Sequence, residues 1–269
     1  MNKFELRLKA YYGGDENAYE ELQRILKKEK RIKTFVAVAC LFIMAFTIVA
    51  VVLFKSYDNK IRNYCELELS QDKTHYVVTG YKGDDTQVII PSVYRGKPIK
   101  SIAYEAFANN NAIEIVIIPD SVTTIEDNAF AGCTSLVEVQ IPSSVTSIGD
   151  YTFSNCSSLV VITLPDSVTT IEDNAFAGCT SLIDILIPPS VISIGDYAFF
   201  NCSSLVAITL PNSVSSIGSF AFGDCDSIYK IEFEGTSDQW ETMNKAENWI
   251  GDKGFYVVYC YNAIIFHSD

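Results

Sequence analysis

Residues 121–143 read SVTTIEDNAFAGCTSLVEVQIPS, residues 167–189 read SVTTIEDNAFAGCTSLIDILIPP, and the two stretches are identical at 18 of 23 positions. The stretches that follow each of them, 144–166 and 190–212, also match each other at 18 of 23 positions. A 46-residue pair of 23-residue units has therefore been duplicated. Self-similarity at a fixed period is typical of a solenoid, in which each unit buries its apolar side chains against its neighbours.

The same period extends in both directions from these four units. Phe, Cys and Pro each recur at a spacing of 23 residues without an insertion, and a Leu or Ile follows shortly after each Cys. Six units fit this frame, from about residue 98 to residue 233. The recurring residues are Phe107, Phe130, Phe153, Phe176, Phe199 and Phe222, then Cys133, Cys156, Cys179, Cys202 and Cys225, and Pro119, Pro142, Pro165, Pro188 and Pro211.

Each unit contains one strand-like segment followed by a turn. In the second unit Leu136, Val139 and Ile141 are the apolar positions, and the last two alternate with polar residues, as in a strand with one buried face. Pro142 ends the strand because proline donates no ladder hydrogen bond. Stacked units should align equivalent residues about 4.8 Å apart in parallel ladders. The predicted fold is a β-rich solenoid of six 23-residue coils.

These units resemble the BspA-like leucine-rich repeats. In five of them Ser-Val is followed by Ile, then by a Phe five residues on, then by Cys and a (Leu/Ile)-x-x-(Ile/Val)-x-(Ile/Leu/Phe) strand. The resemblance covers roughly residues 70–262. It implies a surface-displayed, often bacterial, protein that binds other macromolecules, and it supplies no catalytic residues. The five units begin at Ser121, Ser144, Ser167, Ser190 and Ser213.

A charge-free apolar segment precedes the repeats. Residues 34–54, TFVAVACLFIMAFTIVAVVLF, contain no Pro or Gly, and as a helix they would span about 30 Å, the thickness of a bilayer's hydrocarbon core. Because 33 residues precede the segment, we interpret it as an uncleaved membrane anchor, with a cleavable signal peptide as the alternative. Six Lys/Arg in the ten residues before it, against three in the ten after it, predict a cytoplasmic N-terminus and an extracellular repeat domain at the plasma membrane.

The terminal coils of such an array need caps, because they would otherwise expose core side chains. We expect strands in the N-terminal cap, and a short helix from Thr236 to about Ala246 followed by two strands in the C-terminal cap. The predicted parts of the chain are a basic, helical cytoplasmic tail (1–33), a transmembrane helix (34–54), a linker with the N-terminal cap (55–97), the repeat array (98–233) and the C-terminal cap (234–269).

Charge and motif content restrict the function. Residues 56–269 carry ten Lys/Arg and 27 Asp/Glu, a net charge of −17, which would repel nucleic acid. The chain has two His and no nucleophile-elbow, zinc-protease or phosphate-loop motif. Asp and Glu recur with the repeat, as turn residues do. We therefore expect no enzymatic activity, no cofactor and no metal.

The column of five Cys is the strongest candidate for a metal or disulfide site. Metal ligands must converge on one point, whereas a 23-residue spacing places them along a line. Identical side chains on parallel rungs rarely adopt the torsion of about 90° that a disulfide needs. Cys is one of the most buried residue types. We interpret the column as buried thiols, which weakly opposes the predicted oxidising, extracellular compartment.

Strand alternation leaves two outward columns on a predicted concave face. Between residues 101 and 229 the sequence has 14 Asp/Glu and no Lys or Arg. Exposed apolar residues among acidic ones are typical of a protein-binding surface, whereas an unused scaffold face is the alternative. The candidate partner-binding residues, which would suit a basic protein, are Ile115, Ile117, Glu138, Gln140, Val161, Thr163, Asp184, Leu186, Ala207 and Thr209.

Two functions are compatible with these features. The first is a membrane-tethered, extracytoplasmic leucine-rich repeat module for adhesion or for binding proteins or other ligands at the cell surface. The second is a structural scaffold within a membrane complex, with no external partner. The short linker of about 20 residues expected between the anchor and the first cap strand would keep the array near the bilayer, which weakens the case for direct adhesion to a host.

The topology is tested by adding protease to intact cells. Because residues 34–54 are expected to span the membrane with the N-terminus inside, cleavage should remove the repeat domain and leave residues 1–55 protected. Survival of the repeat domain, under conditions that digest a known external protein, would contradict this orientation.

Overall fold

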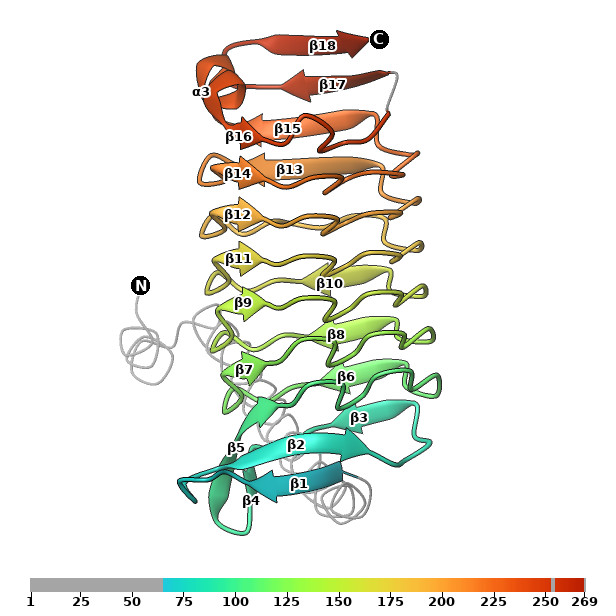
Figure 1. The fold of residues 1–269 in the computed structure, drawn as a ribbon, viewed down its shortest axis with the longest axis vertical. Coiled ribbons are helices and arrows are strands. Elements are labelled where there is room, and N and C mark those ends of the chain that lie inside the picture. The colour runs from blue at the N-terminus through green and yellow to red at the C-terminus, as the bar shows by residue number, and fades with distance from the viewer. Residues whose placement is uncertain (1–64, 253–254, 269) are drawn as a thin grey trace, which may run out of the picture. The chain divides into compact units, whose positions relative to one another are not determined.

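The chain forms a β-solenoid of about eight turns that stack on one another, and the repeats supply one turn per 23 residues (Figure 1). The computed structural model describes residues 65–252 and 255–268, which belong to one structural unit, 60–269. Within these described ranges no helix is both long enough and apolar enough to cross a membrane. The predicted tail (1–33) and membrane segment (34–54) lie outside the described residues.

One side of the solenoid is a ladder of parallel strands formed by the Leu-x-x-Val-x-Ile segments. Glu138 pairs with Ile115 of the preceding unit on one side and with Val161 of the following unit on the other. Where no strand is formed, Leu186 bridges Thr163 and Thr209. The strands of this ladder are β3 (Gln87–Ile89), β6 (Ile115–Ile117), β8 (Glu138–Gln140), β10 (Val161–Thr163), β13 (Ala207–Pro211), β15 (Lys230–Glu234) and β17 (Phe255–Tyr259).

A second ladder of shorter strands forms another side. In the repeats each of its strands is a Thr or Ser followed by a buried Ile, and each pairs in parallel with the equivalent dipeptide of the neighbouring unit. Its strands are β5 (Lys97–Ile102), β7 (Thr124–Ile125), β9 (Ser147–Ile148), β11 (Thr170–Ile171), β12 (Ser193–Ile194), β14 (Ser216–Ile217) and β16 (Asn244–Lys245).

The two ends of the stack are closed as the sequence predicts in outline. At the N-terminal end β1 (Cys65–Leu69) and β2 (Tyr76–Tyr81) form an antiparallel hairpin, and β4 (Val93–Tyr94) pairs with β5. Ten residues separate β1 from the predicted membrane segment, about half of the separation that we expected. At the C-terminal end β18 (Ile264–Ser268) pairs antiparallel with β17.

The predicted helix of the C-terminal cap is shorter than expected. Helix α3 (Ser237–Thr242) begins with a capping box, in which Thr236 accepts from the Gln239 N–H and the Gln239 side chain accepts from the Thr236 N–H. The helix ends at Thr242 instead of near Ala246. The reason is that the next residues form β16, which pairs with β14 and extends the second ladder.

The stack has about eight turns, whereas the sequence predicts six coils. The additional rungs are β3 and β17, which pair in parallel with β6 and β15. Gln87 pairs with Ile115 and Lys230 pairs with Val257, so both coils are longer than the 23-residue unit. A search at a fixed period misses these rungs because their coils contain extra residues.

The recurring Phe residues form one continuous aromatic stack inside the solenoid. Neighbouring rings from Phe107 to Phe222 lie 5.0–5.5 Å apart between centroids, with planes tilted by 6–11°. Tyr81 stacks on the first ring at 5.7 Å, and Trp249 meets the last edge-on at 5.9 Å. All six Phe side chains are buried. The column therefore ties the caps to the repeats.

The recurring Cys side chains are also buried, as predicted, and they bond to the neighbouring coil. The Cys133 Sγ–H donates to the Phe107 carbonyl oxygen at 3.0 Å, and each of the other four makes the equivalent bond at 3.0–3.3 Å. All five are thiols in this structure. Burial raises the pKa of Cys133 to about 11 and that of Cys179 to about 12, so neither thiol is ionised at neutral pH.

Removing one ring of the stack should cost more stability than any change on the surface. Phe176 is fully buried between Phe153 and Phe199, so Phe176→Ala should lower the free energy of unfolding by about 3–5 kcal/mol. The exposed Thr163→Ala should change it by about 0.5 kcal/mol or less. Urea denaturation followed by circular dichroism measures both. The opposite ranking would show that the repeat register is wrong.

Candidate functional site

The outward side chains of the long-strand ladder form the strand face, and they lie where alternation predicts. In the first column Glu138 and Asp184 are exposed, while Ile115 and Ala207 are half-buried. The first column ends at Lys230, which is also half-buried. The buried side chains of the same strands, Val116, Val139, Ile162, Ile185, Ile208 and Ile231, point into the core.

The second column follows the same pattern. Leu186 is the most exposed of its large apolar side chains, at 67% of its surface, and Gln140 and Thr163 are also exposed. Ile117 and Thr209 are half-buried. The predicted residue Val161 lies in β10 opposite Glu138, but its side chain lies outside the described residues. Exposure is confirmed for five of the nine described members, and the other four are half-buried. The role of all of them in binding stays a prediction.

Sequence reasoning missed a third exposed column, which we call the apolar ridge. Each of its residues immediately precedes the strand of its unit or, for Ile183, the equivalent segment. The alternation of inward and outward side chains applies within a strand and therefore does not predict which way these residues face. The sequence signal was an apolar residue at this position in five successive units, after Glu114 in the first one. The apolar ridge is Val137, Val160, Ile183, Val206 and Tyr229, of which Val160 is half-buried and the others are 37–59% exposed.

Backbone hydrogen bonds hold the apolar ridge in place. The Ile183 N–H donates to the Val160 carbonyl oxygen at 3.4 Å, and the Val206 N–H donates to the Ile183 carbonyl oxygen at 3.4 Å. The Tyr229 N–H donates to the Val206 carbonyl oxygen at 3.2 Å. Each rung therefore has its backbone fixed to the next. The ridge is a preformed apolar surface, which reduces the ordering cost of binding.

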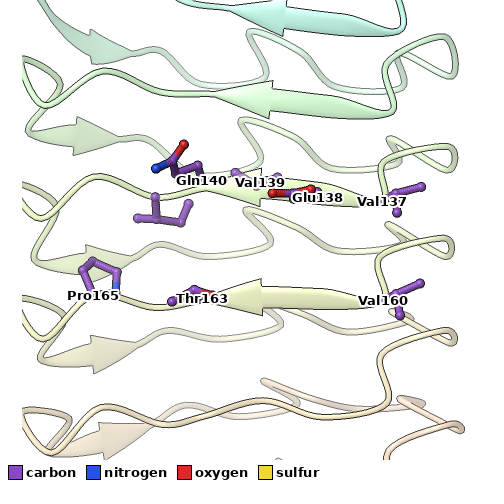
Figure 2. Close-up of a pocket in the computed structure, with 8 residues that line it drawn as sticks. Val137, Glu138, Val139, Gln140, Val160, Thr163 and Pro165 are labelled. Atoms are coloured by element: carbon purple, nitrogen blue, oxygen red, sulfur yellow. The ribbon is translucent and has the colours of Figure 1, made fainter. Parts of the chain in front are cut away.

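A shallow depression of about 760 Å³ crosses the strand face at β8 and β10 (Figure 2). Val137 and Val160 of the apolar ridge line one side, and Gln140 and Pro165 line the other. Glu138 lies on the strand between them. The depression is large enough for an apolar side chain of a partner, with a carboxylate beside it.

Glu138 and Asp184 are the exposed carboxylates in the middle of the strand face. Among the described residues, no salt bridge involves Glu138 or Asp184. At the C-terminal end of the face, by contrast, the Lys230 ammonium pairs with Glu232. Their hydrogen bond raises the pKa of Lys230 and lowers that of Glu232. The centre of the face is therefore negative, whereas its C-terminal end is balanced.

A different set of carboxylates supports the turns. The Asp127 side chain accepts from the Asp150 N–H at 3.0 Å, and the Asp150 side chain accepts from the Asp173 N–H at 3.0 Å. Asp173 and Asp196 make the same bond one coil further on, at 2.7 and 2.6 Å. We call these four residues the Asp ladder. The prediction that repeated Asp residues serve turns is confirmed by these bonds.

The Asp ladder adjoins turns of unusual backbone conformation. The residue after each of its members has a positive φ, between 54° and 57°, and at Tyr151 and Tyr197 this residue is aromatic. Bulky side chains rarely adopt this left-handed region without support from the surrounding structure. The bonds from the Asp ladder to the next coil supply that support at Tyr151 and Tyr197, because they fix the N–H groups of Asp150 and Asp196 immediately before them.

Other candidate residues do not assemble into a catalytic or metal centre. His75 lies beside Thr74 and Asp72 in the turn of the N-terminal hairpin, and the His267 side chain lies outside the described residues. In the part of the chain that the structure describes, no group of three or more His, Cys, Asp or Glu is placed to hold a metal ion. The strand face is therefore the candidate site.

Comparison with known proteins agrees with this architecture. The model of a family described as the BspA type leucine rich repeat region matches residues 100–229 in six copies, which agrees with the repeat frame read from the sequence. A leucine-rich repeat protein from T. pallidum has a crystal structure that is 31% identical, with a TM-score of 0.60. The alignment covers 64% of this chain and 83% of the T. pallidum chain.

Two further structures are more distantly similar. A leucine-rich repeat protein from Eubacterium ventriosum is 23% identical with a TM-score of 0.54, and the alignment covers 68% of this chain but only 50% of that one. A leucine-rich repeat protein from Bacteroides ovatus is 22% identical with a TM-score of 0.47, over 68% of this chain and 65% of that one. No curated protein matches the sequence.

The Asp ladder gives a pH-dependent prediction. Partial burial, together with the charges of Asp127, Asp173 and Glu172, raises the pKa of Asp150. A raised pKa in the folded state means that Asp150 contributes stability below its ordinary pKa and loses that contribution as the pH rises through the raised value. Asp150→Asn keeps an acceptor for the Asp173 N–H but removes the charge. At pH 7 it should increase the free energy of unfolding by up to about 1 kcal/mol.

The gain should shrink as the pH falls through the raised pKa, where folded Asp150 becomes protonated, and it should be smallest below 3.8, the ordinary pKa. Urea denaturation of both proteins at several pH values measures the difference. Asp120→Asn is the control, because Asp120 is exposed and lies outside the Asp ladder. A loss of stability that is equal at all pH values would show that the hydrogen bond, and not the charge, dominates.

Proposed function

Because this chain belongs to the BspA-type leucine-rich repeat family, we propose that it binds a protein partner through the strand face while tethered to a membrane. The solved relatives are bacterial leucine-rich repeat proteins, and a repeat solenoid offers a long, rigid surface suited to binding macromolecules. The proposed activity is binding or adhesion without catalysis.

One observation carries the proposal: exposed apolar side chains and unpaired carboxylates share one rigid face. Leu186 is 67% exposed, and Glu138 and Asp184 lie on the same ladder without a cation among the described residues. A contiguous apolar surface rimmed by polar residues marks a protein interaction site. The partner should present apolar groups bordered by Lys or Arg, because electrostatic complementarity selects partners and accelerates association.

Tethering is supported by the sequence of residues 34–54 and by the basic residues before them. The proposed location is the plasma membrane, in a single pass, with the N-terminus in the cytoplasm and the repeats outside. The ten residues between 54 and β1 would keep the repeats close to the bilayer. This short distance is the observation that favours the second candidate function, a scaffold within a membrane complex without an external partner.

The binding face is tested by adding positive charge to its second column. Gln140 and Leu186 are both exposed, so the double variant Gln140→Lys/Leu186→Lys should fold normally. It should weaken capture of a basic partner at least about tenfold, or 1.4 kcal/mol. Chemical crosslinking on intact cells, followed by mass spectrometry, measures capture. Capture by the unaltered chain should also fall as the salt concentration rises.

The matched control is Thr169→Lys/Ile192→Lys, which adds the same charge at two exposed positions beside the second ladder. This variant should capture the partner normally. Full capture by the folded Gln140→Lys/Leu186→Lys variant would exclude the strand face as the binding site. Absence of any salt-sensitive partner outside the membrane would favour the scaffold.

A further inference from the structure

We propose that the strand face binds an amphipathic α-helix of the partner. The helix would lie along the apolar ridge and carry two Lys or Arg residues, seven positions apart, that face Glu138 and Asp184. This inference rests on the proposed function and adds the secondary structure and the residue pattern of the ligand. Three properties of the strand face support it: its width, its period and the placement of its charges.

The width of the strand face matches one helix. Val137 and Gln140 are three residues apart along one rung, or about 10 Å at 3.3 Å per residue. An α-helix with its side chains is about 10–12 Å across. The depression lined by Val137, Val160, Gln140 and Pro165 occupies this width. A single helix would therefore cover the face from the apolar ridge to the second column.

The period of the apolar ridge also suits a helix. Its five residues, from Val137 to Tyr229, span four rung spacings, or about 19 Å, which equals roughly 13 residues of helix. One helical turn rises 5.4 Å, which exceeds one rung spacing of about 4.8 Å by only about 0.6 Å, so a helix that lies along the ridge drifts by about 2.4 Å over four rungs. An apolar stripe with one side chain per turn would then meet one ridge residue per rung.

The charges on the face select a spacing within the helix. Glu138 and Asp184 lie two rungs apart, or about 9.6 Å, and the rung between them carries Val161. Seven residues of helix rise about 10.5 Å and return to nearly the same side, so basic residues at positions i and i+7 can reach both carboxylates. Between residues 101 and 229 the chain has no basic residue of its own that could occupy these positions.

An extended peptide fits the same face poorly. Side chains on one side of an extended chain repeat about every 6.6–6.8 Å, as a consequence of a rise of about 3.3–3.4 Å per residue. That repeat matches neither one rung of about 4.8 Å nor two rungs of about 9.6 Å. An extended ligand that lies along the solenoid axis would drift by about 1.9 Å per contact and lose register with the ridge after two contacts, whereas a helix along the same line drifts by only about 0.6 Å per turn.

The experiment uses a fluorescein-labelled peptide of about 15 residues, built on the geometry above. Leu occupies its positions 2, 6, 9 and 13, Lys occupies positions 3 and 10, and Ala and Gln fill the rest. Fluorescence anisotropy would measure binding to the full chain in nanodiscs of zwitterionic lipid, with empty nanodiscs as the blank. We expect saturable binding. A peptide with Pro at position 7, or with the second Lys moved to position 8, should bind at least about tenfold more weakly.

Variants of the chain identify the contacts. The double variant Val160→Ser/Ile183→Ser should bind the peptide at least about tenfold more weakly, because both residues lie on the apolar ridge. The double variant Glu138→Lys/Asp184→Lys should lose affinity for this peptide to a similar extent. It should bind a peptide with Glu at positions 3 and 10 instead. Ile192→Thr is the control. Ile192 is 53% exposed beside the second ladder, and the equivalent residue in the neighbouring coil is Thr169.

Equal binding of the helical and the Pro-containing peptide would overturn the helix inference. If that binding were still lost in Gln140→Lys/Leu186→Lys, the strand face would remain the binding site and the proposed function would stand. Failure of the Glu-containing peptide to rescue Glu138→Lys/Asp184→Lys would overturn the predicted charge spacing. If no peptide binds above the blank, the helix inference is wrong, and the crosslinking experiment decides the proposed function independently.

Discussion

The backbone hydrogen bond from each coil to the residue just before the equivalent position in the next coil is the interaction on which the structure depends. The Phe153 N–H donates to the Ala175 carbonyl oxygen at 2.8 Å, and the Phe176 N–H donates to the Ala198 carbonyl oxygen at 2.7 Å. These bonds hold every coil in the same register, so identical residues stack in columns. That alignment produces the aromatic stack, the column of buried thiols and the columns of exposed side chains on the strand face.

The sequence predicted the features that repeat with the 23-residue period, because stacking turns a spacing along the chain into a position in space. Phe176 and Leu136 are buried for this reason, and Glu138 and Leu186 are exposed. The rungs β3 and β17 were missed because their coils contain extra residues. The apolar ridge was missed because Val137 precedes β8, where alternation within the strand does not apply. The repeat period indicates which residues are exposed, but it does not indicate which molecule they bind.

Two kinds of carboxylate in the repeats have different physical roles. Asp150 accepts a backbone N–H from the next coil and thereby fixes a turn, so its carboxylate is engaged within the fold. Glu138 and Asp184 have no cationic partner among the described residues, so their charge remains available to other molecules. A net charge alone cannot separate these roles. The hydrogen-bond pattern can, because it separates the carboxylates that serve the backbone from those that do not.

The two tryptophans of the chain, Trp240 and Trp249, both lie in the C-terminal cap, with ring centroids 5.7 Å apart. Trp249 also closes the aromatic stack against Phe222. In a quasi-one-dimensional array each coil contacts only its neighbours, so the ends can unfold separately from the middle. Intrinsic tryptophan fluorescence therefore reports on one end of this molecule, whereas circular dichroism averages over all of its coils. The separation between the two unfolding curves is a direct spectroscopic measure of how far cooperativity extends along the solenoid.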